Sequence, residues 1–168
     1  LRRPFYFEVC PADAIPATSD SYDAVIANHM LYHVPDLDAA LSELLRIIRP
    51  GGRLFTATNG QNHLVELTHL MRRVDPDIQY DAGSLHHRFG LENGRKRIAA
   101  FFAETEMLRY PDQLLVTEVE PLVDYIQSTH QLTEAQRTRL RSIVGEEIRT
   151  SGAFRISKDS GLFRARKA

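Results

Sequence analysis

The chain has 168 residues, of which 43% are hydrophobic and 26% charged, with a formal net charge of −1. This is enough for one domain with a substantial core, and the near-zero net charge argues against a surface that binds nucleic acid through bulk positive charge. No apolar run approaches the roughly 20 residues of a membrane span, and a single cysteine, Cys10, excludes an internal disulfide and fits the reducing cytoplasm.

The N-terminal third predicts two strands separated by a turn region. The aromatic and β-branched segment Phe5–Cys10 predicts the first strand, and residues 11–21, rich in Pro, Ser and Asp, predict the turn. The apolar run in Tyr22–Asn28 lacks polar alternation, which is typical of a parallel strand buried on both faces. Ligands of open α/β sheets lie beyond the carboxyl ends of such strands, so we expect a ligand near Asn28 and His29.

A strand–helix–strand unit follows. Asp36 is a good N-cap, and the apolar residues from Leu37 to Arg49 have helical spacing with one face turned to a sheet. Pro50-Gly51-Gly52 ends this helix, and residues 53–58 predict a strand. The crossover makes this strand parallel to Tyr22–Asn28.

The second half of the chain predicts a mixture of helices and strands. Thr133 and Gln136 form a capping-box pattern at the start of one helix, and Gly152 should end it. Turn-forming residues 158–161 lie between two strand-like segments and predict a hairpin. The remaining expected elements are helices at 63–74, 93–104 and 121–128, a strand at 105–110 and a short apolar piece at 114–117.

Four stretches occur in an order that resembles the class I S-adenosylmethionine-dependent methyltransferases, above all the ubiquinone and menaquinone C-methyltransferases. They read CPADAIP, YDAVIANHMLYHVPD, LSELLRIIRPGGRLFTAT and FRISKDSGLFRARK. The resemblance implies an α/β, partial Rossmann-like fold comprising strands 3 to 7 of that family, with a mixed sheet and an antiparallel C-terminal hairpin. It further implies a single truncated domain, with a cofactor side (1–60), a helical cover with the sixth strand (61–109), a helical insertion (110–152) and the hairpin (153–168).

The sequence departs from that family at its N-terminal side. The family's glycine-rich cofactor loop, and the acidic residue that holds the ribose hydroxyls, have no counterpart among these residues. We therefore expect the chain to begin at the family's third strand, which would leave one edge of Tyr22–Asn28 unpaired. Because an open apolar edge is prone to pairing, we expect a homodimer through this edge or a return of Phe5–Cys10 against it.

The resemblance also implies cofactor contacts at four residues. Asp13 would accept a hydrogen bond from the exocyclic amine of adenine, and the Ala14 backbone N–H would contact a ring nitrogen. Asn28 and His29 would approach the methionine part of S-adenosylmethionine. From the residues alone, Asp13 can equally satisfy local backbone groups in a turn, and Asn28 and His29 can cap or bond within a loop.

Three further histidines have more than one interpretation. His33 is a candidate general base or orienting group, or a packed structural residue; its spacing from His29 lacks a third ligand, so we predict no metal site. The cluster His86-His87-Arg88 lines an acceptor pocket or belongs to an exposed loop.

The resulting functional prediction is S-adenosylmethionine-dependent methyl transfer to a small-molecule acceptor in the intact enzyme, of which this chain is expected to be an incomplete part, without nucleic-acid or membrane partners. The alternative is a non-catalytic methyltransferase-like remnant that acts as an oligomerising or interaction module. A nicotinamide dinucleotide enzyme is less consistent with the sequence, because it too needs a glycine-rich turn of the G-x-G-x-x-G type.

Overall fold

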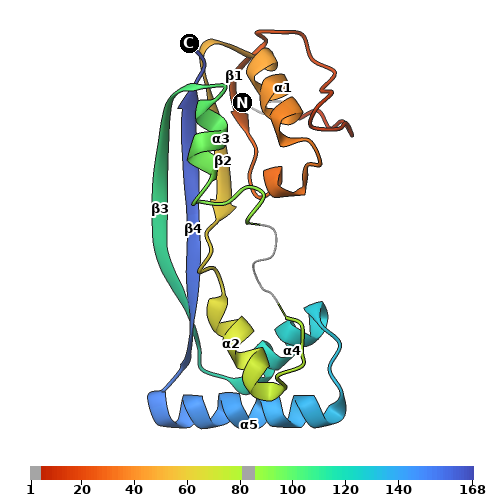
Figure 1. The fold of residues 1–168 in the computed structure, drawn as a ribbon, viewed down its shortest axis with the longest axis vertical. Coiled ribbons are helices and arrows are strands. Elements are labelled where there is room, and N and C mark those ends of the chain that lie inside the picture. The colour runs from red at the N-terminus through yellow and green to blue at the C-terminus, as the bar shows by residue number, and fades with distance from the viewer. Residues whose placement is uncertain (1–4, 81–85) are drawn as a thin grey trace.

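The computed structural model describes residues 5–80 and 86–168, and its centre is a four-stranded mixed sheet of order β1-β2-β4-β3. β1 is parallel to β2, whereas β4 is antiparallel to both β2 and β3. The long strands β3 and β4 run along most of the molecule (Figure 1). The predicted α/β class with a mixed sheet is thus confirmed. The strands are β1 (Tyr22–Ile26), β2 (Ile48–Asn59), β3 (Ala103–Val116) and β4 (Phe154–Arg166).

One hydrophobic core lies between the sheet and the helices α1 (Leu37–Ile47) and α3 (Gly94–Ala99). The Asp36 side chain accepts a hydrogen bond from the Ala39 backbone N–H at 2.9 Å, which caps α1 as predicted. Phe89 and Phe163 meet edge to face in this core, with ring centroids 5.8 Å apart. The α1 residues in this core are Leu37, Leu41, Leu44 and Ile47.

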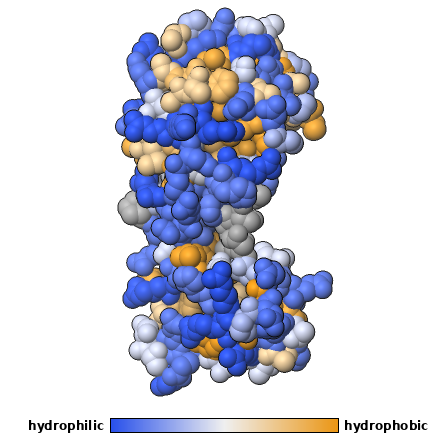
Figure 2. Space-filling view, viewed as in Figure 1, coloured by the Kyte–Doolittle hydropathy of each residue, from blue (hydrophilic) through white to orange (hydrophobic). Residues whose placement is uncertain are grey.

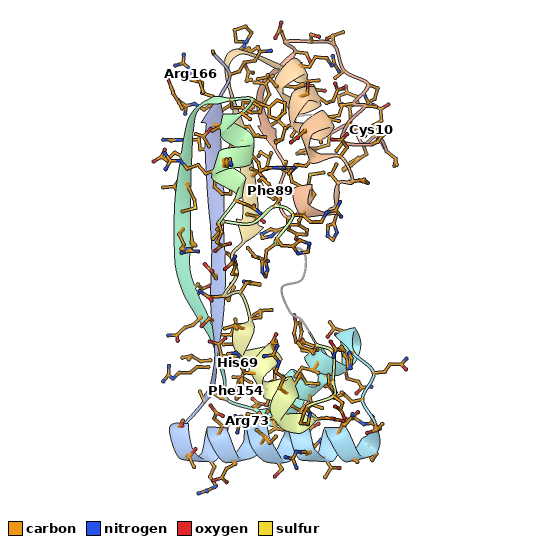
Figure 3. All side chains as sticks on the ribbon, viewed as in Figure 1. Cys10, His69, Arg73, Phe89, Phe154 and Arg166 are labelled. Carbon is orange, nitrogen blue, oxygen red and sulfur yellow. The ribbon has the colours of Figure 1, made fainter. Side chains whose placement is uncertain are left out.

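A second core forms where the helices α2 (Val65–Val74), α4 (Val119–Thr129) and α5 (Glu134–Ser151) gather at the other end of β3 and β4 (Figure 1). The capping box of Thr133 and Gln136 is present, and Gly152 ends α5 in the left-handed region at φ 78°. Figure 3 labels Phe154 in this helical lobe and Phe89 in the other core. In Figure 2 the two bulky lobes are joined by a narrower, mainly hydrophilic middle.

The C-terminal segment differs from the predicted hairpin. Residues 158–161 do not turn, because β4 continues without interruption from Phe154 to Arg166. Gly161 pairs with Arg109, and a Cβ there would lie 2.8 Å from the Leu108 carbonyl oxygen and from Leu91 Cδ2. The glycine therefore allows a close approach inside the sheet and does not form a turn.

Two other local predictions are wrong. Phe5–Cys10 forms no strand; Phe5, Phe7 and Val9 are 85%, 95% and 104% exposed, and the segment does not fold back on β1. A strand needs a paired neighbour, and no described strand pairs with this segment. The helix expected at 93–104 ends at Ala99, and β3 already begins at Ala103, with an irregular register and a positive φ of 50° at Glu104.

Within the described ranges, no helix is long and apolar enough to cross a membrane.

Candidate functional site

Asn28 and His29 lie just beyond the carboxyl end of β1, as the sequence predicted. Asn28 Oδ1 accepts a hydrogen bond from the Ala57 backbone N–H at 3.0 Å, and the His29 backbone N–H donates to the Ala57 carbonyl at 2.9 Å. Asn28 therefore prolongs the pairing between β1 and β2 with its side chain. His29 takes a positive φ of 50°, an uncommon conformation for a residue other than glycine. Both side chains are exposed at the edge of the sheet.

The acidic turn that contains Asp13 and Ala14 is fixed against α1. Glu43 accepts a hydrogen bond from the Ile15 backbone N–H at 2.9 Å, and Arg46 donates to the Ile15 carbonyl at 3.1 Å. The hydrogen bond from Arg46 lowers the pKa of Glu43 to about 2, so the Glu43 carboxylate is ionised at neutral pH and keeps its ion pair with Arg46. Ile15 contacts the same core as Ala27 and Met30. The turn and the end of β1 thus flank one core.

Asp13 and Ala14 differ in what they can offer a ligand. Both are exposed, and in the described part of the chain no hydrogen bond or ion pair involves the Asp13 carboxylate. The Ala14 backbone N–H, however, donates to the Pro11 carbonyl at 3.2 Å. Asp13 is available as an acceptor, whereas the Ala14 donor would have to exchange a turn hydrogen bond for a ligand.

His33 ends the short 3-10 helix Leu31–His33 and is exposed. Its ring lies 4.6 Å from that of Tyr32, at an interplanar angle of 60°. Arg88 donates hydrogen bonds to the Val34 and Pro35 carbonyls at 3.3 and 3.4 Å, so it holds the segment that follows His33. Beside it lies a pocket of about 390 Å³, lined by Leu31, Val34, Pro35, Leu37, His87, Arg88, Asn93 and Arg97.

Residues 86–91 are held against the carboxyl end of β2. The Thr58 hydroxyl donates to the Phe89 carbonyl at 2.8 Å, and the Leu91 backbone N–H donates to the Asn59 carbonyl at 3.2 Å. These bonds bring His86 to the same edge of the sheet as His29. The His86 Nδ1 atom is buried without a hydrogen-bond partner among the described residues, so it is a polar atom that a bound molecule could satisfy.

His63 is the site residue that the sequence reasoning missed. Its Nδ1 lies 3.5 Å from the Ser160 hydroxyl, and that hydroxyl donates to Asn59 Oδ1 at 2.9 Å. Burial lowers the pKa of His63; the nearby Asp159 carboxylate opposes this, while His29, Lys158 and His86 add to it. The imidazoles of His29 and His86 are therefore close enough to His63 to affect its pKa.

A sequence signal for His63 did exist. Asn59-Gly60-Gln61-Asn62-His63 is a polar run directly after a buried strand, the same pattern that indicated Asn28 and His29 after β1. Applying the strand-end rule to β2 as well as β1 would have found it. In the part of the chain that the structure describes, no group of three His, Cys, Asp or Glu side chains is arranged to hold a metal ion.

Comparison with known proteins finds relatives of part of the chain. Residues 2–56 match the family model described as a methyltransferase domain. The malonyl-[acyl-carrier protein] O-methyltransferase of Methylococcus capsulatus is 41% identical over 64 residues, which are 38% of this chain and 23% of that protein. The ubiquinone/menaquinone biosynthesis C-methyltransferase of Geobacter sulfurreducens is 41% identical over 46 residues, which are 27% of this chain and 18% of that protein.

Solved structures extend the likeness to nearly the whole chain. A methyltransferase candidate from Bacillus halodurans superposes with a TM-score of 0.57 at 17% identity, covering 94% of this chain and 75% of that one. The YcgJ protein of Bacillus subtilis superposes with a TM-score of 0.54 at 14% identity, covering 93% of this chain and 68% of that one. The resemblance to the class I S-adenosylmethionine-dependent methyltransferases is thus confirmed, by sequence over residues 2–56 and by fold along the chain.

Proposed function

We propose that this chain supports S-adenosylmethionine-dependent methyl transfer to a small-molecule acceptor at the carboxyl edge of β1 and β2. The observation that supports it best is the methyltransferase-domain match over residues 2–56, a stretch that contains Asp13, Asn28 and His29. The relatives' aligned parts amount to about a quarter of their length or less. The activity of such longer proteins therefore reaches this chain only as a proposal.

The described residues fit the cofactor in part. The exposed Asp13 carboxylate suits the exocyclic amine of adenine, a hydrogen-bond donor. Asn28 has its oxygen committed to Ala57, which leaves its amide N–H groups to donate toward a ligand. His29 presents its ring at the same edge. The Ala14 backbone N–H fits less well, because it already donates to Pro11.

Methyl transfer requires the chain's own residues mainly to align the acceptor with the methyl group. Bound S-adenosylmethionine supplies a methyl group already activated by its sulfonium sulfur, so alignment with the acceptor dominates the rate. A base is needed only where the acceptor must lose a proton. Besides the earlier candidate His33, His63 lies at the same edge and can serve in that role, since burial lowers its pKa and favours the neutral imidazole.

Isothermal titration of the chain with S-adenosylmethionine tests the proposal. We expect binding that Asp13→Ala weakens at least tenfold, because a charged acceptor for adenine is removed. Asp124→Ala is the matched control, since Asp124 is an equally exposed carboxylate on α4 in the helical lobe. Absence of binding, or equal weakening by both substitutions, would overturn the assignment of the adenine contact to Asp13.

We also propose that the protein is cytoplasmic, because its single cysteine fits a reducing compartment.

We further propose that β1 associates with the β1 of a second copy. In the described sheet β1 is an edge strand, and its Ile26 is 70% exposed. Ile26→Lys should shift a dimer to monomer in sedimentation velocity, whereas Tyr110→Lys, at the opposite edge on β3 and 73% exposed, should not. A monomeric parent, or a dimer broken only by Tyr110→Lys, would contradict this.

A further inference from the structure

The helical lobe contains a pocket that differs in character from the polar edge of the sheet. It has a volume of about 330 Å³ and lies between α2, α4 and the ends of β3 and β4. This volume is within the range of small-molecule sites. Its lining is mainly apolar and includes Leu67, Leu114, Val116, Leu122 and Ile156; the lining residues with polar side-chain groups are His63, Lys158 and Tyr125.

The pocket has a rigid floor and an accessible mouth. Leu67, Leu122 and Ile156 are 1%, 4% and 2% exposed and belong to the second core. Leu114 and Tyr125 are 42% and 46% exposed. A ligand can therefore reach buried apolar walls without unfolding the lobe, and burial of apolar surface would drive its binding.

Lys158 and His63 differ in what they can offer a ligand. Lys158 Nζ forms an ion pair with Asp112 at 2.8 Å, so its charge is already compensated and does not call for an anionic ligand. In the described part of the chain, the polar contact of the His63 ring is a long one, 3.5 Å from Nδ1 to the Ser160 hydroxyl. Because that hydroxyl donates its proton to Asn59, its lone pairs favour the His63 proton on Nδ1, which leaves Nε2 as an acceptor.

The charge state of His63 supports this role. Burial lowers its pKa, the Asp159 carboxylate raises it, and electrostatic interaction with His29, Lys158 and His86 lowers it further. The lowered pKa keeps the imidazole neutral at pH 7, when it accepts a hydrogen bond from an O–H group. His63 also interacts electrostatically with His29 and His86 at the edge of the sheet, so it links the pocket to the proposed site.

We propose that this pocket binds the acceptor, and that the acceptor is an apolar, ring-containing molecule whose hydroxyl group donates a hydrogen bond to His63. That the ligand is the methyl acceptor rests on the proposed function, whereas its binding in this pocket does not. An apolar ring system matches the leucine, isoleucine and tyrosine walls, and a hydroxyl donor matches the Nε2 acceptor of His63. A charged or strongly polar molecule would leave groups unpaired against these walls.

Fluorescence titration with 1-naphthol tests the pocket. We expect saturable binding at one site, weakened at least tenfold by Leu114→Trp, because the larger side chain fills the mouth. Leu115→Trp is the matched control: Leu115 is adjacent on β3, is 52% exposed and is absent from the pocket lining. No binding, or equal loss with both variants, would overturn the proposal.

The hydroxyl contact is tested with 1-methoxynaphthalene, which has the same rings but no O–H donor. The parent chain should prefer 1-naphthol about fivefold, the worth of a neutral hydrogen bond, and His63→Phe should remove that preference while keeping both ligands bound. A preference unchanged by His63→Phe would refute the role of His63. S-adenosylmethionine titration of the same samples separates the two ideas, since naphthol binding can fail while cofactor binding persists, and the reverse.

Discussion

Glu66 joins the first turn of α2 to β4. Its replacement by glutamine tests how much the hydrogen bonds of its carboxylate stabilise the helical lobe. Glu66 Oε1 accepts a hydrogen bond from the Ser157 hydroxyl at 2.5 Å, and Oε2 accepts one from the Ser157 backbone N–H at 2.8 Å. The Leu64 backbone N–H donates to the Ser157 carbonyl at 2.9 Å in the same place. One carboxylate thus satisfies two donors where α2 begins beside the apolar pocket.

The expected cost of Glu66→Gln follows from these two bonds. A hydrogen bond to a charged group contributes roughly 1.5–3 kcal/mol to stability. Glutamine can keep an oxygen toward the Ser157 backbone N–H, but it removes the charge and leaves an amide N–H facing the Ser157 hydroxyl, which must then rotate to accept. We expect a loss of about 2 kcal/mol in the free energy of unfolding at neutral pH, as one such bond is removed. Urea denaturation followed by circular dichroism measures it.

The pH dependence gives a second signature. Burial raises the pKa of Glu66, but the hydrogen bonds from the Ser157 hydroxyl and backbone together lower it further, so the net pKa lies below 4.5. A lowered folded-state pKa means that the stabilisation is present above the unfolded value and is lost as pH falls through the folded value. The difference between parent and Glu66→Gln should therefore shrink below pH 4.5.

Glu134→Gln is the matched control, because Glu134 also lies in the first turn of a helix but is exposed, with a surface partner in Arg137. Its cost should be at most about 0.5 kcal/mol, as for surface ion pairs. Equal costs for the two substitutions, or a Glu66→Gln cost that stays constant into acid, would refute the reasoning.

Two further substitutions test the packing of a core and the cap of a helix. Gly94→Ala should cost about 1–3 kcal/mol through overpacking, because its Cβ would lie 2.6 Å from Phe163 Cε2; thermal unfolding measures this, and a Phe163→Leu background should relieve most of it. Thr133→Ala should cost about 1 kcal/mol through loss of an N-cap, since the Thr133 hydroxyl accepts from the Gln136 backbone N–H at 3.3 Å. A cost for Thr133→Ala that matches Thr138→Ala, within the same helix, would contradict the cap assignment.

The elements that the sequence predicted well are those specified by neighbouring residues. The Asp36 cap, the apolar stripe of α1 and the Thr133 capping box each involve residues within a few positions, and each is present in the structure. Tyr22–Ile26 and the strand that follows α1 are parallel, because α1 returns the chain to the end of the sheet where the first strand began. Local signals therefore sufficed for these parts of the fold.

Predictions failed where a residue's role depends on a distant partner. Gly161 has the composition of a turn residue, but it is needed because Leu108 and Leu91 come close to it across the sheet. Phe5–Cys10 has strand composition and no described partner. Asn28 and His29 were located correctly by the strand-end rule, yet the bond of Asn28 to Ala57 depends on the register between β1 and β2, which composition does not specify.

The position of His63 explains why cofactor and acceptor sides can be separated by mutation. β2 ends at Asn59 while β4 continues past it, pairing Asn59 with Ser160 and then reaching the helical lobe. His63 follows this point in the chain and precedes α2, so it is the described residue that borders both the sheet edge and the apolar pocket. The acidic turn, by contrast, is clamped to α1 through Glu43 and Arg46. Substitutions in the pocket mouth should therefore change ligand binding there without changing the adenine side, and substitution of Asp13 should do the reverse.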